Sequence, residues 1–332
     1  MNHLLLTRTA ADSCVDEFAA IAAHTATIIR PIYFPETGEL NLNGDEEREI
    51  NAAYISPDLV MEGGSVRRFF NYLELLPNLK WVHSGFAGID HPVFGKLLKR
   101  GVKLSNSPGA ASEPIAHSAM AGLLSLARRL PYFANQQHKQ IWQRLPPDLI
   151  AEDLSSQTLV VYGLGAIGTE LARLASAFGL YTIGVRRHPR RTDDAVDELV
   201  HPDDLNVILP RADWLAVTAN LTKDTRGAIG EDQLGRLPSG AHVLNVARGA
   251  IIDEPALIAS LQSGHLGGAY LDVFAVEPLP MESPLWELPN VIVSPHNSWA
   301  AKGNTERARL IFLTNLEAWL GDEPLPHHVS ER

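Results

Sequence analysis

The feature that most constrains this chain is a glycine-rich turn, Gly163-Leu164-Gly165-Ala166-Ile167-Gly168, between an apolar run and an alanine-rich stretch. The run at 158–162 predicts a β-strand, and residues 166–178 predict a helix. With this spacing, the first glycine permits the tight turn, the second lets the backbone approach a pyrophosphate, and the third lets the helix pack on the strand. The helix N-terminus then offers free N–H groups to the phosphates. The motif predicts a dinucleotide-binding unit, with a ligand-free glycine turn as the alternative.

Strand and helix patterns alternate on both sides of this motif, which predicts largely parallel sheets. Before it, apolar runs predict strands at 4–6, 27–29, 52–55, 79–82 and 101–104. Helices are predicted at 15–23, with Asp12 or Ser13 as the cap, at 66–76, and, rich in small residues, at about 112–129. After the motif, strands are predicted at 181–185, 214–217, 242–245, 268–271 and 291–293, and a last helix at about 304–320. A chain of 332 residues exceeds the roughly 250–300 at which one core stops growing, so we expect two domains.

The composition argues against several other classes of protein. The net charge is −11 with no basic tail, so we expect neither nucleic acid nor an anionic membrane as a partner. No apolar run reaches the ~18 residues of a membrane span, and residues 1–8 lack the layout of a signal peptide, so we expect a cytoplasmic protein. Because Cys14 is the one cysteine, neither an intrachain disulfide nor a cysteine-based zinc site can form, and no metal is expected.

The residues after the next predicted strand indicate which dinucleotide is bound. An NAD site places an Asp or Glu about twenty residues past the glycine motif, where it takes the ribose 2′-hydroxyl. Here that place holds Val185-Arg186-Arg187-His188-Pro189-Arg190-Arg191, and we take Asp193 as the next acid. Arginine grips a phosphate with forked, charge-assisted hydrogen bonds. We therefore expect NADPH to be preferred, led by Arg186 and Arg187, with NAD open as a second cofactor and a solvated basic loop as the alternative reading.

Three segments that follow predicted strands carry the candidate catalytic residues. They are Asn245-Val246-Ala247-Arg248-Gly249, then Leu271-Asp272-Val273-Phe274 leading to Glu277-Pro278, then Ser294-Pro295-His296-Asn297. In a doubly wound sheet, ligands bind outside the carboxyl ends of the strands. We therefore expect Arg248, Glu277 and His296 to meet at the cofactor.

These motifs, in this order, resemble the D-isomer-specific 2-hydroxyacid dehydrogenase family, and within it most of all the NADPH-using glyoxylate/hydroxypyruvate reductases. The resemblance runs from the loop at 84–90 to the C-terminal helix. It implies an α/β fold of two Rossmann-like, doubly wound parallel-sheet domains with an active-site cleft between them. Residues 1–102 and 297–332 would form a flavodoxin-like substrate domain, and residues 103–296 the dinucleotide-binding Rossmann domain. The resemblance also implies a homodimer with the 112–129 helix at its interface; a buried core helix is the alternative.

Reduction of a 2-keto acid requires these residue types. It puts a hydride on the carbonyl carbon and a proton on its oxygen, and histidine suits the proton transfer because it titrates near neutrality. We expect His296 to be the general acid, and the base when the alcohol is oxidised. Glu277 would orient the imidazole and favour its protonated form, and Arg248 would hold the substrate carboxylate and polarise the carbonyl. Purely structural roles for these three residues are the alternative.

The resemblance implies further contacts with less specific signals. Those with the cofactor involve Gly163, Gly165, Ala166, Ile167, Gly168, Arg186, Arg187, Ala219, Asn220 (where the family usually has proline), Val246, Ala247 and Asp272. Those with a small 2-keto or 2-hydroxy acid involve Arg248 and the backbone N–H groups of Ala87 and Gly88. Phe86 and Trp299 lie close to these positions and would narrow the pocket towards small substrates, with simple core filling as the alternative. The physiological keto acid stays open, because the family spans several.

Two other functions share this fold. One is a dinucleotide-sensing, corepressor-like binding protein, against which the arginine-rich loop and the short tails argue. The other is an NAD-dependent phosphite or formate dehydrogenase, against which the missing ribose acid argues.

Overall fold

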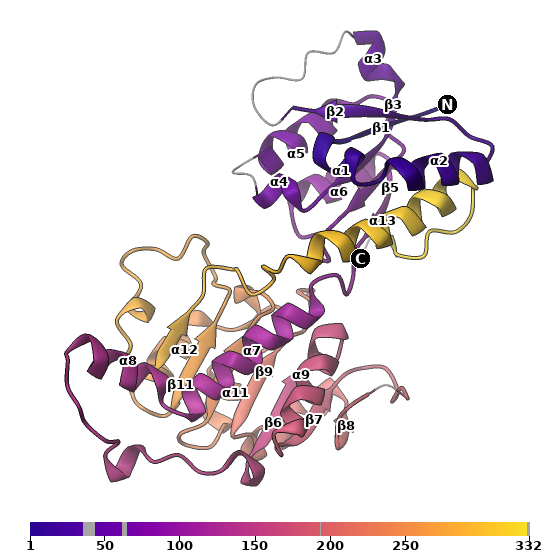
Figure 1. Cartoon of the computed structure of the whole chain (residues 1–332). Helices are drawn as coiled ribbons and strands as arrows, with labels where there is room; N and C mark the ends of the chain where they lie inside the picture. The colour runs from indigo at the N-terminus through magenta and orange to yellow at the C-terminus, as the bar shows by residue number, and fades with distance from the viewer. Residues whose placement is uncertain (36–43, 62–64, 193, 331–332) are drawn as a thin grey trace. The chain divides into compact units, whose positions relative to one another are not determined.

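The computed structural model describes residues 1–35, 44–61, 65–192 and 194–330 (Figure 1). The chain divides into two compact units: unit 1 is Met1–Ala111 with Ala301–Arg332, and unit 2 is Ser112–Ala300. These boundaries differ from the expected ones at 102/103 and 296/297. The first boundary lies later in the chain than expected because strand β5 (Lys103–Asn106) pairs with β4 (Trp81–Ser84) and so belongs to the sheet of unit 1.

Unit 1 contains a six-stranded sheet in the order β13-β5-β4-β3-β1-β2. Neighbouring strands are parallel except at the edge, where β13 is antiparallel to β5. The five parallel strands follow the flavodoxin-like order 2-1-3-4-5. Besides β4 and β5, the strands are β1 (Asn2–Thr7), β2 (Ile29–Phe34), β3 (Ile50–Ile55) and β13 (His328–Val329).

Helices cover both faces of this sheet, because alternate side chains of its strands enter two separate cores. Leu5 lies in the core with Phe69 and Leu97, whereas Leu4 and Leu6 lie in the core with Phe312. Figure 1 shows the C-terminal helix α13 on the same side of the unit as α2. The helices are α1 (Arg8–Asp12), α2 (Val15–His24), α3 (Gly44–Glu49), α4 (Asp58–Met61), α5 (Ser65–Leu75), α6 (Pro92–Lys99) and α13 (Gly303–Leu320).

Two details near the N-terminus differ from the sequence prediction. The expected strand at 27–29 begins later, at Ile29, because the register with β1 pairs residues 29–34 with residues 2–7. Neither Asp12 nor Ser13 caps α2, whose N-cap residue is Cys14 without a side-chain capping bond. Ser13 instead closes the preceding helix, since its hydroxyl donates to the Ala10 carbonyl at 2.8 Å.

Unit 2 contains a seven-stranded, wholly parallel sheet in the order β12-β11-β10-β9-β6-β7-β8. Read from β8, this is the doubly wound dinucleotide-binding order 3-2-1-4-5-6 with one further strand. The strands that follow β6 in the chain are added on one of its sides up to β8 and on its other side from β9 onward, so the strand order reverses beside β6. The strands are β6 (Thr158–Tyr162), β7 (Tyr181–Val185), β8 (Glu198–Val200), β9 (Trp214–Val217), β10 (His242–Asn245), β11 (Gly268–Leu271) and β12 (Val291–Val293).

Six α-helices and six short 3-10 segments are described in unit 2. The α-helices are α7 (Ser112–Ala127), α8 (Leu130–His138), α9 (Ala166–Ala177), α10 (Leu205–Ile208), α11 (Glu231–Arg236) and α12 (Glu254–Gln262). The 3-10 segments are η1 (Pro147–Leu149), η2 (Leu154–Ser156), η3 (Pro202–Asp204), η4 (Leu209–Arg211), η5 (Gly249–Ile251) and η6 (Pro284–Trp286).

The small residues of α7 serve packing inside unit 2. Ala116, Ala119 and Ala127 lie in one core with residues of β6, α9 and β11. Gly122 lies against Tyr270, so closely that a Cβ at this position would be 2.4 Å from the ring. Core packing therefore accounts for these four small residues, whereas Ala121 is exposed. The expected interface stays a prediction.

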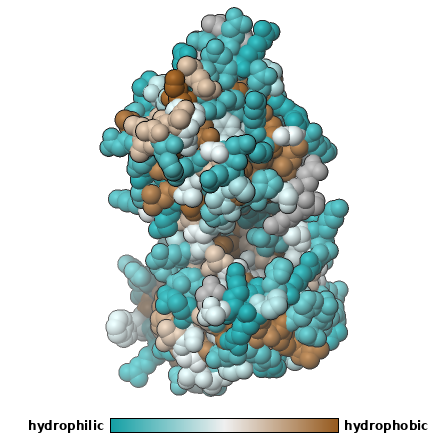
Figure 2. All heavy atoms as spheres, turned by 90° about the vertical axis from the view of Figure 1, so that its right-hand side faces the viewer, coloured by the Kyte–Doolittle hydropathy of each residue, from teal (hydrophilic) through white to brown (hydrophobic). Residues whose placement is uncertain are grey.

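Hydrophilic residues cover most of the face of the molecule in Figure 2, with hydrophobic residues scattered among them. This agrees with a net charge of −11. Within the described residues, no helix has the length and apolar character needed to cross a membrane.

Candidate active site

The glycine-rich turn joins β6 to α9 at the point where the strand order of unit 2 reverses (Figure 1). A Cβ at Gly163, where φ is +105°, would lie 2.4 Å from the Ala219 backbone, and one at Gly168 would lie 2.5 Å from the Gly163 carbonyl oxygen. At Gly165 a Cβ would meet no atom within 4 Å. Packing therefore requires glycine at positions 163 and 168, whereas Gly165 leaves open space beside the backbone. This is the cradle that a dinucleotide pyrophosphate needs.

The first turn of α9 supplies the donors that such a cradle requires. Gly165 is the N-cap residue, and no side chain caps this end of the helix. Gly165 and Ala166 are exposed, and Ile167 is half-buried. The open N–H groups and the positive end of the helix dipole therefore face the space beside Gly165.

Two further loops carry expected cofactor contacts. Ala219 lies against Gly163. The next residue, Asn220, is held by Thr225, whose hydroxyl donates to the Asn220 carbonyl at 2.6 Å. Val246 and Ala247 are buried directly after β10. All of these positions follow carboxyl ends of strands, as the doubly wound fold requires of a ligand site.

The first two of the four arginines after β7 are each held by an aspartate. The guanidinium of Arg186 donates to both carboxylate oxygens of Asp194, at 2.7 and 2.5 Å, and Arg187 donates to Asp224 at 2.7 Å. Burial raises the pKa of Asp194, but the hydrogen bonds from Arg186 and from the Arg191 backbone, together with the charges of both arginines, outweigh burial and lower that pKa. The acid named from the sequence, Asp193, lies outside the described residues. Sequence reasoning missed Asp194 and Asp224, because no spacing rule pairs an arginine with a carboxylate farther along its own loop or in the loop after another strand.

Arg248 is positioned by the turn that follows β10. Asn245 fixes this turn twice, because its side-chain oxygen accepts from the Ala247 N–H at 3.1 Å and its amide donates to the Arg248 carbonyl at 3.2 Å. The next residue, Gly249, lies so close to Phe274 that a Cβ would be 1.9 Å from the Phe274 carbonyl carbon. The chain around Arg248 therefore lies directly against the segment that leads to Glu277.

His296 and Glu277 form a direct pair. Nδ1 of His296 lies 2.7 Å from Oε2 of Glu277, and the other carboxylate oxygen accepts the Phe274 N–H at 3.0 Å. Burial would raise the pKa of Glu277, but the hydrogen bonds from His296 and Phe274 and the charges of His296 and Arg248 lower it. All three expected catalytic residues therefore converge in unit 2: His296 contacts Glu277, and Arg248 acts on the same carboxylate electrostatically.

The backbone at His296 is strained, with φ at +50°. Such a conformation is uncommon for a residue with a Cβ and tends to occur at functional sites. Asp272 stabilises this backbone conformation, because its carbonyl accepts the His296 N–H at 2.7 Å. Its carboxylate also accepts the N–H groups of Asn297 and Ser298, at 2.9 and 3.0 Å. The described contacts of the Asp272 carboxylate thus anchor the loop that carries His296. Its expected contact with the cofactor stays a prediction.

The expected substrate residues lie on different units. Trp299 follows His296 in unit 2 and donates its indole N–H to the His296 carbonyl at 3.0 Å. Phe86, Ala87 and Gly88 follow the carboxyl end of β4 in unit 1, where Asn106 donates to the Ala87 carbonyl at 2.7 Å. Their role in substrate binding stays a prediction.

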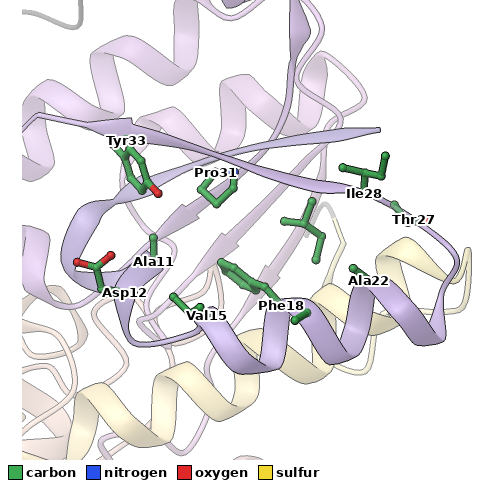
Figure 3. A pocket seen from close by; sticks show the side chains of 11 residues that line it. Ala11, Asp12, Val15, Phe18, Ala22, Thr27, Ile28, Pro31 and Tyr33 are labelled. Carbon is green, nitrogen blue, oxygen red and sulfur yellow. The ribbon is translucent and has the colours of Figure 1, made fainter.

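A separate groove of about 400 Å³ lies in unit 1 between the α1–α2 segment and the edge strand β2 (Figure 3). Its lining is mostly apolar, including Val15, Phe18 and Ile28, and Asp12 is its one charged lining residue. None of the expected site residues lines it. Within the described part of the chain, no cluster of three or more His, Cys, Asp or Glu residues could hold a metal ion.

A glycine-rich turn at the switch point of a doubly wound sheet, with a histidine–carboxylate pair at neighbouring strand ends, defines an NAD(P)-dependent oxidoreductase. Residues 120–298 match the family model described as D-isomer specific 2-hydroxyacid dehydrogenase, NAD binding domain. The chain belongs to this family.

Known relatives agree with this assignment. The chain is 36% identical, over 77% of its own length and 78% of the relative, to glyoxylate/hydroxypyruvate reductase B of Yersinia enterocolitica. Its structure matches a D-isomer specific 2-hydroxyacid dehydrogenase from Xanthobacter autotrophicus in complex with NADPH and MES, with a TM-score of 0.73, 29% identity, and 99% and 98% of the two chains covered. It also matches the NADPH-dependent glyoxylate/hydroxypyruvate reductase of Sinorhizobium meliloti in complex with NADP and sulfate, with a TM-score of 0.73, 26% identity, and 99% and 98% covered.

Proposed function

We propose that this protein reduces a small 2-keto acid, glyoxylate or hydroxypyruvate, to the D-2-hydroxy acid with NADPH as the hydride donor. The observation that carries the proposal is the 2.7 Å contact between His296 Nδ1 and Glu277 Oε2, in a loop strained at His296. Relatives whose names state glyoxylate/hydroxypyruvate reduction support the choice of substrate class.

His296 is the general acid. Its Nδ1–H donates to Glu277, so Nε2 is the ring nitrogen left to carry the proton that the carbonyl oxygen takes up. Glu277 fixes the tautomer and stabilises the imidazolium, as the carboxylate does in other histidine–carboxylate pairs. In the reverse direction the neutral ring accepts the alcohol proton at the same atom.

Arg248 binds the substrate carboxylate and polarises the carbonyl through its planar, permanently charged guanidinium. When bound, the dinucleotide would supply the hydride. The turn at Gly163–Gly168 would hold its pyrophosphate, and the arginine-rich loop after β7 favours the phosphorylated form.

We also expect a homodimer. Most small residues of α7 pack within unit 2, but the segment that follows exposes large apolar side chains at Leu130, Phe133, Ile141 and Trp142. Ile141 and Trp142 are adjacent in the chain, and exposed apolar surface of this kind commonly marks a protein interface.

The test is a steady-state assay of cofactor oxidation, followed by absorbance, with glyoxylate, hydroxypyruvate, pyruvate and phenylpyruvate, each with NADPH and with NADH. The proposal predicts the highest kcat/KM for glyoxylate or hydroxypyruvate with NADPH. A clear preference for NADH would contradict the cofactor assignment. No turnover with any of the four acids would contradict the reaction and favour a dinucleotide-sensing binding protein.

A further inference from the structure

The two adjacent arginines that follow β7 lie in opposite environments. The side chain of Arg186 is 10% exposed and its partner Asp194 is fully buried, whereas Arg187 and its partner Asp224 are 58% and 62% exposed. A basic loop that looks uniform in the sequence therefore contains one buried and one exposed ion pair.

Arg186 uses all of its donor capacity inside the protein. A guanidinium has five N–H groups. Nε donates to the His188 carbonyl, one terminal nitrogen to Asp194 and the Leu164 carbonyl, and the other to Asp194 and the Pro189 carbonyl. A phosphate could bind Arg186 only by displacing these partners. Breaking this buried ion pair would leave the Asp194 carboxylate with Arg191, whose Nε is 3.8 Å away, as its one described cation, which is costly for a buried charge.

The partners of Arg186 show what it does instead. Leu164 belongs to the glycine-rich turn, and His188, Pro189 and Asp194 belong to the loop after β7. Asp194 also accepts the Arg191 N–H at 2.6 Å. The buried pair therefore ties together the two loops that would hold the phosphates and the adenosine ribose.

Arg187 has the environment expected of a phosphate ligand. Its one described hydrogen bond is the 2.7 Å contact with Asp224, which lies in the loop after β9. Both Arg187 and Asp224 act electrostatically on Tyr162, the last residue of β6, so the pair lies near the glycine-rich turn. An exposed ion pair contributes little to stability, so a phosphate dianion can take the place of Asp224 at little cost.

We propose that Arg187 discriminates NADPH from NADH, that Asp224 competes with the 2′-phosphate for it, and that Arg186 with Asp194 is a positioning pair. This inference rests on the proposed use of NADPH.

The experiment measures the Kd of NADPH and of NADH by fluorescence titration, together with the Tm of the cofactor-free protein. The variants are Arg187→Gln, Asp224→Asn, Arg186→Gln and Asp194→Asn. Arg236→Gln is the matched control, because Arg236 forms a similarly exposed pair with Asp232 on α11, outside the candidate site.

We expect Arg187→Gln to raise the Kd of NADPH at least about tenfold, through loss of a charge-assisted bond, with NADH affected less than about twofold and Tm unchanged. Asp224→Asn should lower the Kd of NADPH several-fold. Arg186→Gln and Asp194→Asn should lower the Tm and weaken both cofactors by similar factors. The control should change none of these values.

The inference is overturned if Arg186→Gln weakens NADPH alone and leaves Tm and NADH binding unchanged, or if Arg187→Gln weakens both cofactors equally. Should Arg186→Gln fail to fold, the ratio of the NADPH and NADH Kd values of Arg187→Gln still tests the inference. A wild-type protein that binds NADH more tightly overturns both this inference and the proposed cofactor. A protein that binds NADPH selectively through Arg187 but reduces no keto acid overturns only the proposed reaction.

Discussion

Nδ1 of His296 lies 2.7 Å from Oε2 of Glu277, although 18 residues separate the two along the chain and they follow different strands of unit 2. The contact exists because the Asp272 backbone and carboxylate hold the loop of His296, while the Phe274 N–H holds the second oxygen of Glu277. Both partners of the pair are therefore positioned from one segment, Asp272–Phe274, directly after β11.

Replacing Glu277 with glutamine should lower kcat for keto-acid reduction by about 10-fold to 100-fold, because the imidazolium loses its carboxylate partner. Steady-state kinetics with glyoxylate measures this loss. Glu254→Gln is a useful control, since Glu254 accepts the nearby Ala275 N–H and has no described hydrogen bond to His296. An unchanged kcat in Glu277→Gln would remove this residue from the mechanism.

Two alanine substitutions in the glycine-rich turn should distinguish an effect on cofactor binding from an effect on folding. Gly165→Ala places a methyl group in open space, so the Tm of the cofactor-free protein should stay the same, while the Kd of NADPH rises about tenfold because the backbone no longer approaches the pyrophosphate. Gly168→Ala, whose Cβ would lie 2.5 Å from the Gly163 oxygen, should lower the Tm. An unchanged Kd of NADPH in Gly165→Ala would contradict binding of the pyrophosphate beside Gly165.

Unit 1 should lose stability in acid through His83. Burial, with the charge of His327 as a smaller cause, lowers the pKa of His83 to about 3 from its ordinary 6.5. The neutral ring bridges Ser105 and Ser107 at 2.8 and 2.9 Å. Because the unfolded chain binds the proton first, stability is complete above about pH 6.5 and is lost as the pH falls toward about 3.

Urea unfolding measures this effect. From pH 7 to pH 5, His83 should account for a loss of about 2 kcal/mol, and His83→Gln should be less stable at pH 7 but lack that part of the acid dependence. His24→Gln is the control, because His24 is exposed beside Glu317. Equal acid dependence in wild type and His83→Gln would contradict the assignment.

The oligomeric state should depend on the segment after α7. Trp142 is fully exposed and Ile141 beside it is about half exposed, which a second copy of the chain would cover. Light scattering should give a dimer for the wild type and a monomer for the double variant Ile141→Ser, Trp142→Ser, with the Tm of the monomer little changed. A wild-type monomer would contradict the homodimer.

Much of this architecture could be predicted from the sequence, because buried parallel strands appear as short apolar runs and the glycine turn has fixed spacing. The strands at 158–162, 181–185 and 242–245 agree with β6, β7 and β10 in full. The family and the two parallel-sheet units are confirmed. β8 was missed because its three residues, Glu198–Val200, carry no apolar periodicity.

The environment of the arginines could not be predicted, because it depends on the folded loop. Arg186 and Arg187 are neighbours with the same chemistry, yet one is buried against Asp194 and the other is exposed beside Asp224. Composition and spacing carry no signal for that difference. For the same reason the strain at His296 and its anchoring by Asp272 appear only in the structure.

The central claim is that His296 delivers the proton in NADPH-dependent keto-acid reduction. The most direct measurement is the single-turnover rate of NADPH oxidation with glyoxylate in the wild type and in His296→Gln, together with the Kd of NADPH for each. We expect the rate to fall by about 100-fold to 10,000-fold with the Kd nearly unchanged. A variant that turns over within a few-fold of the wild type would contradict the account.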